Sequence, residues 1–221
     1  MEELKALVHK LENECGEKEQ IKILQEIGDK LLTEYSIVIG NEKIEPLRVE
    51  AYYYPYNDAQ KFFDPSVHPS SVKINNFGRL YFIEPRYGYP GVDLCLSLGD
   101  YYLSYLIKNS RIGDTLFKQT ALYDKYQQQW YEIQKMDVIH REPNNNKVVF
   151  HTSRVGLTEA RTKFAHESLA SMIDINTKDF YDYERNYGKE WTFEAYLNEH
   201  KVDDIPAFCR EHLGYCPRRQ K

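Results

Sequence analysis

The sequence predicts a single α+β domain, in which a curved antiparallel or mixed β-sheet has flanking helices and the chain has helical segments at both ends. Three observations lead to this fold class: amphipathic helical periods open the chain, several short strand patterns follow, and no repeat or linker divides the 221 residues. A chain of this size buries enough surface to fold without disulfides or metals. We expect a helical segment at 1–35, a core at 36–170 and a helical extension at 171–221.

Two amphipathic helices are predicted at the N-terminus. Apolar residues recur at helical spacing on both sides of Gly16, namely Leu4, Leu7, Val8, Leu11, Ile21, Leu24, Ile27 and Leu31. Residues 1–40 also hold 9 Asp/Glu and 5 Lys/Arg, which is −4 of the total net charge of −5. A solvated outer surface is the favoured interpretation of these acidic faces, and docking of a protein partner is the alternative.

Strand patterns begin directly after the helices. Ser36 to Ile39, followed by Gly40 and Asn41, predicts a short strand and a hairpin turn. The next strand, about 44–54, places Arg48, Glu50, Tyr52 and Tyr54 on one side and apolar residues on the other. Further strands are predicted at 78–83, 93–98, within 101–107 and at 148–151, and the mixed region 108–140 includes a helix near 122–134.

Loops and C-terminal helices complete the predicted fold. The stretch 55–76 has no apolar period and reads as an exposed loop, whereas the tip at 84–91 is dense in Pro, Gly and Tyr and should turn with its tyrosines projecting. Near the end, Thr192 is placed to cap a helix that runs to His200, and a second helix lies between Pro206 and Gly214.

Composition and missing motifs exclude several classes of protein. No apolar run reaches the roughly 20 residues of a membrane-spanning helix and the first residues lack a signal-peptide core, so we expect a cytoplasmic location and no membrane partner. The four cysteines are scattered, and neither Cys15 nor Cys95 has the surroundings of an activated thiolate. A Gly-rich phosphate cradle and a G-x-S-x-G elbow are missing, which argues against kinases, NTPases and serine hydrolases.

Four side chains that can bind zinc lie near the C-terminus: His200, Cys209, His212 and Cys216. Their pattern, H-x8-C-x2-H-x3-C, lacks the paired C-x-x-C knuckles of structural zinc sites. Packing and surface roles are therefore favoured over zinc, and no metal or other cofactor is predicted.

One group of residues could support a reaction. Glu50 and Tyr52 share a strand face at the strand's end, and His68 lies in the loop that follows. A carboxylate among aromatic rings and a histidine suits a flat, electron-poor ring, because the rings can stack on it and the carboxylate can activate water. Side-chain chemistry alone favours a structural alternative: an exposed Glu on an edge strand, a loop histidine, and a core rich in the chain's 19 tyrosines.

Seven short motifs occur in one order along the chain: Leu31-Leu32, Ile37 to Gly40, Glu50-Ala51-Tyr52, Asp64 to His68, Gly78 to Tyr81, Tyr87-Gly88 and Ser153 to Gly156. This succession resembles the alkyladenine (methylpurine) DNA glycosylase family over about residues 30–170. Each motif is weak alone, and the specificity of the resemblance lies in the shared order. The implied fold is that family's α+β domain.

The resemblance also implies a site and a partner. Glu50 matches the general base that aligns water on the anomeric carbon, Tyr52 and His68 match residues that sandwich the extruded base, and Tyr87 matches the wedge that enters the duplex. Tyr81 and Arg154 match residues of the base and DNA-contacting surface, and Ser97, two residues after Cys95, stands where the family has an asparagine that discriminates among purines. The implied partner is double-stranded DNA with an alkylated or deaminated purine, and the reaction needs no lysine Schiff base.

Departures from the family pattern favour an alternative of another class. Ile83 stands where the family has a stacking aromatic residue, and residues 164–169 lack the family's basic and aromatic side chains. Together with the net charge, these departures favour a non-catalytic module of the same fold that binds a protein or a nucleotide through a tyrosine-rich surface. A Glu50 carboxylate fully engaged by a neighbouring cation, with no slot beside it, would leave only the kinship of fold.

Overall fold

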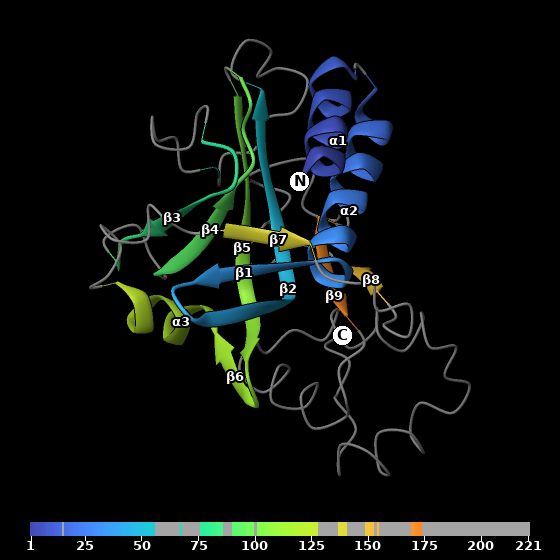
Figure 1. The fold of residues 1–221 in the computed structure, drawn as a ribbon. Helices are drawn as coiled ribbons and strands as arrows, with labels where there is room; N and C mark the ends of the chain where they lie inside the picture. Colours follow the sequence, from blue (N-terminus) through green and yellow to red (C-terminus); the bar gives the residue numbers. More distant parts are fainter. Residues whose placement is uncertain are drawn as a thin grey trace, which may run out of the picture.

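The computed structural model describes residues 1–14, 16–55, 67, 76–85, 90–99, 101–127, 137–140, 149–152, 154 and 169–173. These residues form three helices and one curved sheet of nine strands, in which all strand pairs are antiparallel (Figure 1). The predicted mixed α+β architecture with an antiparallel sheet is confirmed.

The helices are α1 (Glu2–Asn13), α2 (Glu17–Thr33) and α3 (Gln119–Tyr126). The strands are β1 (Tyr35–Ile39), β2 (Glu42–Pro55), β3 (Arg79–Ile83), β4 (Gly91–Cys95), β5 (Tyr101–Ile112), β6 (Thr115–Lys118), β7 (Asp137–His140), β8 (Val149–Thr152) and β9 (Ala170–Ile173). The sheet order is β3-β4-β5-β2-β1-β7, with β6 on β5 and with β9 between β2 and β8. The long β2–β5 pair therefore forms the centre of the sheet.

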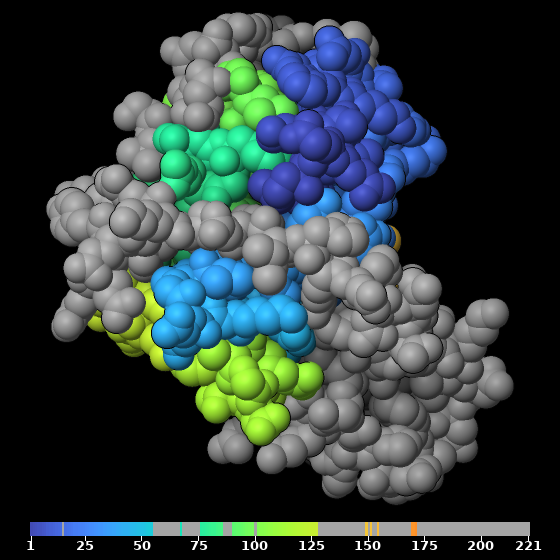
Figure 2. Space-filling view, viewed as in Figure 1, coloured from blue at the N-terminus to red at the C-terminus, as the bar shows by residue number. Residues whose placement is uncertain are grey.

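The two N-terminal helices form as predicted, since their apolar stripes are buried. Helix α2 packs against β2 and β9, and α1 packs on α2, so both lie along one side of the sheet (Figure 1). Lys30 of α2 ties the pair together, because its Nζ lies 2.7 Å from Glu3 of α1 and 3.1 Å from Glu34. The outer sides of the helices form one flank of the surface (Figure 2).

The predicted hairpin between β1 and β2 is also present. Gly40 has φ = 58°, a left-handed conformation that glycine adopts without steric cost, and Ile37 pairs with Ile44 across the turn. Beyond the turn, β2 is flanked by β5 on one side and by β1 and then β9 on the other. It is thus an interior strand.

Two segments differ from the prediction. Strand β5 continues to Ile112 and turns at Gly113, with φ = 57°, into β6, where the sequence indicated only a mixed region; α3 then starts at Gln119 rather than near 122. Residues 171–173, expected to begin a helical extension, are part of β9 and pair with β2 and β8. The β9 segment becomes a strand because its pairing with β2 and β8 satisfies its backbone groups, whereas β6 pairs with the adjacent β5 across the turn at Gly113.

Several predictions lie outside the described residues. They are most of the 55–76 loop, Tyr87 in the tip, the helices near the C-terminus, and the group His200, Cys209, His212 and Cys216. Within the ranges that the structure describes, no helix is both long and apolar enough to cross a membrane.

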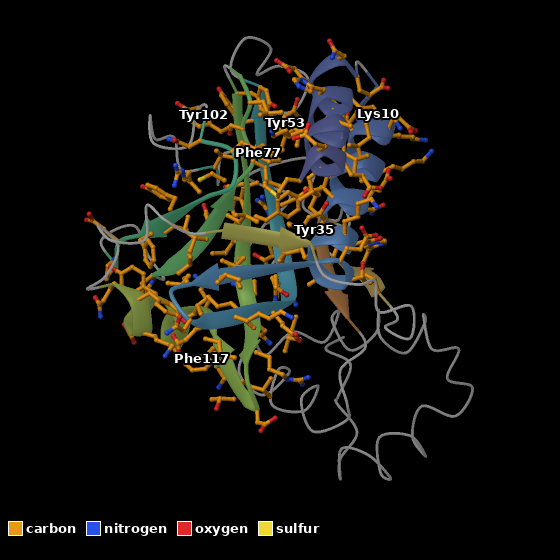
Figure 3. The ribbon with its side chains drawn as sticks, in the orientation of Figure 1. Lys10, Tyr35, Tyr53, Phe77, Tyr102 and Phe117 are labelled. Atoms are coloured by element: carbon orange, nitrogen blue, oxygen red, sulfur yellow. The ribbon has the colours of Figure 1, made fainter. Side chains whose placement is uncertain are left out.

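Much of the tyrosine excess serves the core. Tyr53 and Tyr101 meet edge to face at 6.1 Å between ring centroids, and the buried Tyr105 hydroxyl donates a hydrogen bond of 2.8 Å to the Leu24 carbonyl of α2. In Figure 3, Tyr53 lies on the helix side of the sheet, whereas Tyr102 lies on the other side. Tyrosines thus occupy both faces of the sheet, and those on the face away from α1 and α2 do not belong to the core under these helices.

The core tyrosines make stability fall at high pH. Burial raises the pKa of Tyr101 to about 12, and it raises the pKa of Tyr105 as well. An unfolded tyrosine has a pKa of about 10, so the stabilisation is complete below pH 10 and is lost as the pH rises towards the folded value. We predict that the free energy of unfolding in urea declines above pH 10, and declines less steeply in Tyr101→Phe. Parallel declines in the two proteins would contradict this assignment.

Candidate functional site

Alternation along β2 separates an apolar face from a polar one. Leu47, Val49, Ala51 and Tyr53 are buried on the side where α2 packs. The opposite side, here called the polar face, is extended across the sheet by strand register. One row holds Glu50, Leu106, Asp93 and Tyr81, and the next holds Tyr52, Ser104, Cys95 and Arg79.

Glu50 is the centre of a buried ionic group on this face. The Arg48 guanidinium donates to Glu50 Oε1 at 2.9 Å, and both side chains are only 1% exposed. Glu50 Oε2 accepts a longer hydrogen bond of 3.4 Å from the Tyr52 hydroxyl and lies 3.9 Å from Lys108 Nζ of β5. Two cations and a phenol therefore surround one carboxylate.

Arg154 joins this group from a segment distant in sequence. It donates a hydrogen bond of 2.7 Å to the Ala51 carbonyl, and its guanidinium carbon lies 4.0 Å from the centroid of the Tyr52 ring. Stacking of this kind fixes the plane of an aromatic ring by cation–π attraction. Arg48, Glu50, Tyr52, Lys108 and Arg154 are called the Glu50 cluster below.

The structure corrects two expectations about Glu50. The residue lies in the middle of the 14-residue β2 and not at a strand end, and the structural alternative of an exposed carboxylate on an edge strand is wrong. The reason is that β5 and β9 pair with β2 on both sides at this position, Glu50 being opposite Leu106 and Ala170. Neither pairing is visible in the local sequence.

The remaining predicted site residues do not join the Glu50 cluster: two lie elsewhere in the sheet region, and two lie outside the described residues. Tyr81 shares the polar face but lies three strands from Glu50, which is roughly 14 Å along the sheet. The Ser97 hydroxyl accepts a hydrogen bond from the Leu103 N–H at 2.9 Å and donates to the Leu103 carbonyl at 3.3 Å, so it bridges backbone next to β4. His68 and Tyr87 lie outside the described residues. The structure thus brings together Glu50, Tyr52 and Arg154.

Three charged residues of the polar face, Arg48, Lys108 and Asp93, were not among the candidate site residues predicted from the sequence. Arg48 and Glu50 are two positions apart on one strand, so alternation was a sufficient signal for their pairing. Lys108 and Asp93 reach the polar face through β5 and β4, and only the strand order reveals this. Asp93 is buried and accepts a hydrogen bond of 3.1 Å from the Ser104 hydroxyl.

Burying the charges of the Glu50 cluster costs free energy, and its side chains include a carboxylate, a phenol and three cationic groups. Removing charges from water costs several kcal/mol per ion, and pairing repays that cost only when the geometry is good. A carboxylate has the chemistry to orient water and an aromatic ring to stack, but Glu50 is 1% exposed with Arg48 on Oε1, and Arg154 covers one side of the Tyr52 ring. Among the described residues, no three or more His, Cys, Asp and Glu side chains form a metal site.

No protein-family model matches the chain, and a search of curated proteins finds no similar sequence. The likeness to the DNA glycosylases therefore stays a prediction from the order of the motifs in the sequence.

The buried pair has a matched control on the same strand. Lys43 and Glu45 are also two positions apart in β2, but their closest atoms are 3.9 Å apart and their side chains are 48% and 29% exposed. We predict that Arg48→Met lowers the free energy of unfolding by about 3–5 kcal/mol, since it leaves a buried charge uncompensated, whereas Lys43→Met costs less than about 1 kcal/mol. Urea denaturation measures both values. Equal losses in the free energy of unfolding would show that the buried Arg48–Glu50 pair stabilises the fold no more than the exposed Lys43–Glu45 pair.

Proposed function

We propose that the chain is a DNA N-glycosylase-like protein that releases alkylated or deaminated purines, with the Glu50 cluster as its reaction centre. The observation that carries the proposal is the contact between two motifs separated by about a hundred residues: Arg154 binds the Ala51 carbonyl and stacks on Tyr52. In the resembling family both motifs belong to the site. Their convergence here supports the same use of the polar face.

The geometry suits hydrolysis of an N-glycosidic bond. The Arg48 guanidinium binds Oε1 of Glu50 and fixes the carboxylate, and Oε2, which accepts from Tyr52 at 3.4 Å and lies 3.9 Å from Lys108 Nζ, is the oxygen that we assign to the attacking water. The water attacks the anomeric carbon as the damaged purine leaves, because an alkylated or protonated purine is a good leaving group. Flipping the nucleotide out of the duplex costs a few kcal/mol. Stacking on Tyr52 offsets about 1–3 kcal/mol of that cost.

A second candidate is favoured by the same ion pair. Arg48 occupies Oε1 and Glu50 is 1% exposed, which are the properties of a structural carboxylate as well as of a positioned one. In this case the domain binds a nucleotide or a protein through the tyrosines of the polar face and catalyses nothing. Binding without base release distinguishes this candidate from the first.

Base release from damaged duplexes tests the proposal. Duplexes that contain hypoxanthine, ethenoadenine or 3-methyladenine are incubated with the protein and then treated with alkali, which cuts the strand where a base is missing. We predict cleavage by the wild type and a loss of about 10²-fold or more in Glu50→Gln, as expected for removal of a general base. Glu45→Gln, on the same strand and partly exposed, should keep full activity.

Gel-shift experiments on the same duplexes separate the two candidates. Binding by the glycosylase should weaken steeply with salt, because phosphate contacts release counterions. Salt-dependent binding to DNA with no base release on any substrate would support the non-catalytic module, and the absence of both would exclude DNA as the partner.

A further inference from the structure

Strand β8 leads directly to the Glu50 cluster, because Arg154 follows the end of this strand by two residues. Within the described part of the sheet, β8 is an outer strand that pairs with β9 alone. A four-residue strand with a single ladder has few hydrogen bonds, and such segments open locally at a low cost in free energy. The placement of Arg154 therefore depends on what else holds β8.

His151 connects β8 to helix α2. Its Nε2 lies 2.7 Å from Oδ1 of Asp29, and the two side chains are 28% and 33% exposed. Because a carboxylate only accepts hydrogen bonds, Nε2 donates, and the imidazole is held in one orientation. The contact ties the outer strand to a helix that packs on the centre of the sheet.

Strand register explains why His151 faces the helix. His151 is opposite Ser171 of β9, and Ser171 is opposite Val49 on the apolar face of β2. Helix α2 approaches this point closely at Gly28, where a Cβ atom would lie 2.5 Å from the Ser171 hydroxyl oxygen. Asp29 is the next residue of α2 and is thereby within reach of His151.

Arg154 acts on the other side of the sheet. It donates a hydrogen bond of 2.7 Å to the Ala51 carbonyl, and its guanidinium carbon lies 4.0 Å from the centroid of the Tyr52 ring. Both contacts depend on where the chain lies after β8. One short segment thus makes a contact on the helix side at His151 and, three residues later, a contact on the polar face at Arg154.

We propose that the Asp29–His151 pair positions Arg154 in the Glu50 cluster by holding β8 against α2. Asp29 and His151 are positioning residues in this scheme, because they act on the cluster through Arg154. When the pair is broken, β8 is free to shift, and the Arg154 guanidinium loses its place over Tyr52. The consequence for base release rests on the proposed function, whereas the placement of Arg154 does not.

The NMR signal of the Arg154 side-chain Nε–Hε group tests the proposal in the protein without DNA. The ring current of Tyr52 shifts this signal upfield, and Arg154→Lys assigns the signal by removing it. We predict that His151→Ala moves the signal to the position of an exposed arginine, whereas His151→Gln, whose amide can donate to Asp29, keeps it. His9→Ala removes an exposed histidine that contacts a glutamate on α1 and should leave the signal unchanged.

Asp29→Ala breaks the same pair from the helix side, so the test does not depend on how His151→Ala folds. Movement of the Arg154 signal in Asp29→Ala, with the backbone amide signals of β2 and β5 unchanged, supports the proposal. An Arg154 signal that keeps its upfield shift in a folded variant of either residue overturns it.

Kinetics of base release provide a second measurement. Since Arg154 fixes the ring that stacks on the base, His151→Ala should raise KM about 10-fold and change kcat by less than about 2-fold, and His151→Gln should restore KM. Absence of base release by the wild type would remove the glycosylase proposal and leave the placement of Arg154 to the NMR result. Base release with an unmoved Arg154 signal in His151→Ala would retain the glycosylase and remove the positioning role.

Discussion

The buried ion pair between Arg48 and Glu50 is the interaction on which this account of the molecule depends. It is held at 2.9 Å in the middle of the central strand, with both side chains 1% exposed. Strand β2 can place two charges there only because β5 and β9 flank it and because its other face supplies the apolar contacts with α2. The same alternation that builds the core thus aligns Arg48, Glu50 and Tyr52 on the opposite side.

The two faces of the sheet have different roles: one packs against the helices to form the core, and the polar face holds charged and polar side chains. The face that α1 and α2 cover supplies most of the buried apolar surface. The other face therefore need not be apolar and can hold charges and partly buried tyrosines. Hydrogen bonds bind several of these side chains to the backbone or to one another, as Arg154 binds Ala51 and Ser104 binds Asp93. Such connections fix a constellation in one geometry, which both recognition and catalysis require.

Local pattern predicted the parts of the fold that depend on local physics. The helices followed from the spacing of Leu4 to Leu31, the hairpin from Gly40, and the two faces of β2 from alternation. The β5 extension and β9 escaped prediction because their ladders with β2 join residues far apart in sequence, whereas β6 forms a local hairpin with β5 that the mixed composition of this region did not indicate. In the site, Glu50, Tyr52 and Arg154 could be proposed from the order of motifs, whereas the burial of Glu50 and the approach of Lys108 depend on strand pairing that no short motif encodes.

The most direct measurement is a crystal structure of the protein with a duplex that carries a cationic pyrrolidine in place of one nucleotide, a mimic of the oxocarbenium-like sugar. We predict an everted pyrrolidine on the polar face, stacked near Tyr52, with its ring nitrogen in hydrogen-bond reach of Glu50 Oε2 directly or through one water. A duplex bound elsewhere on the protein, with the polar face closed and the Arg48–Glu50 pair untouched by any nucleotide, would contradict this prediction.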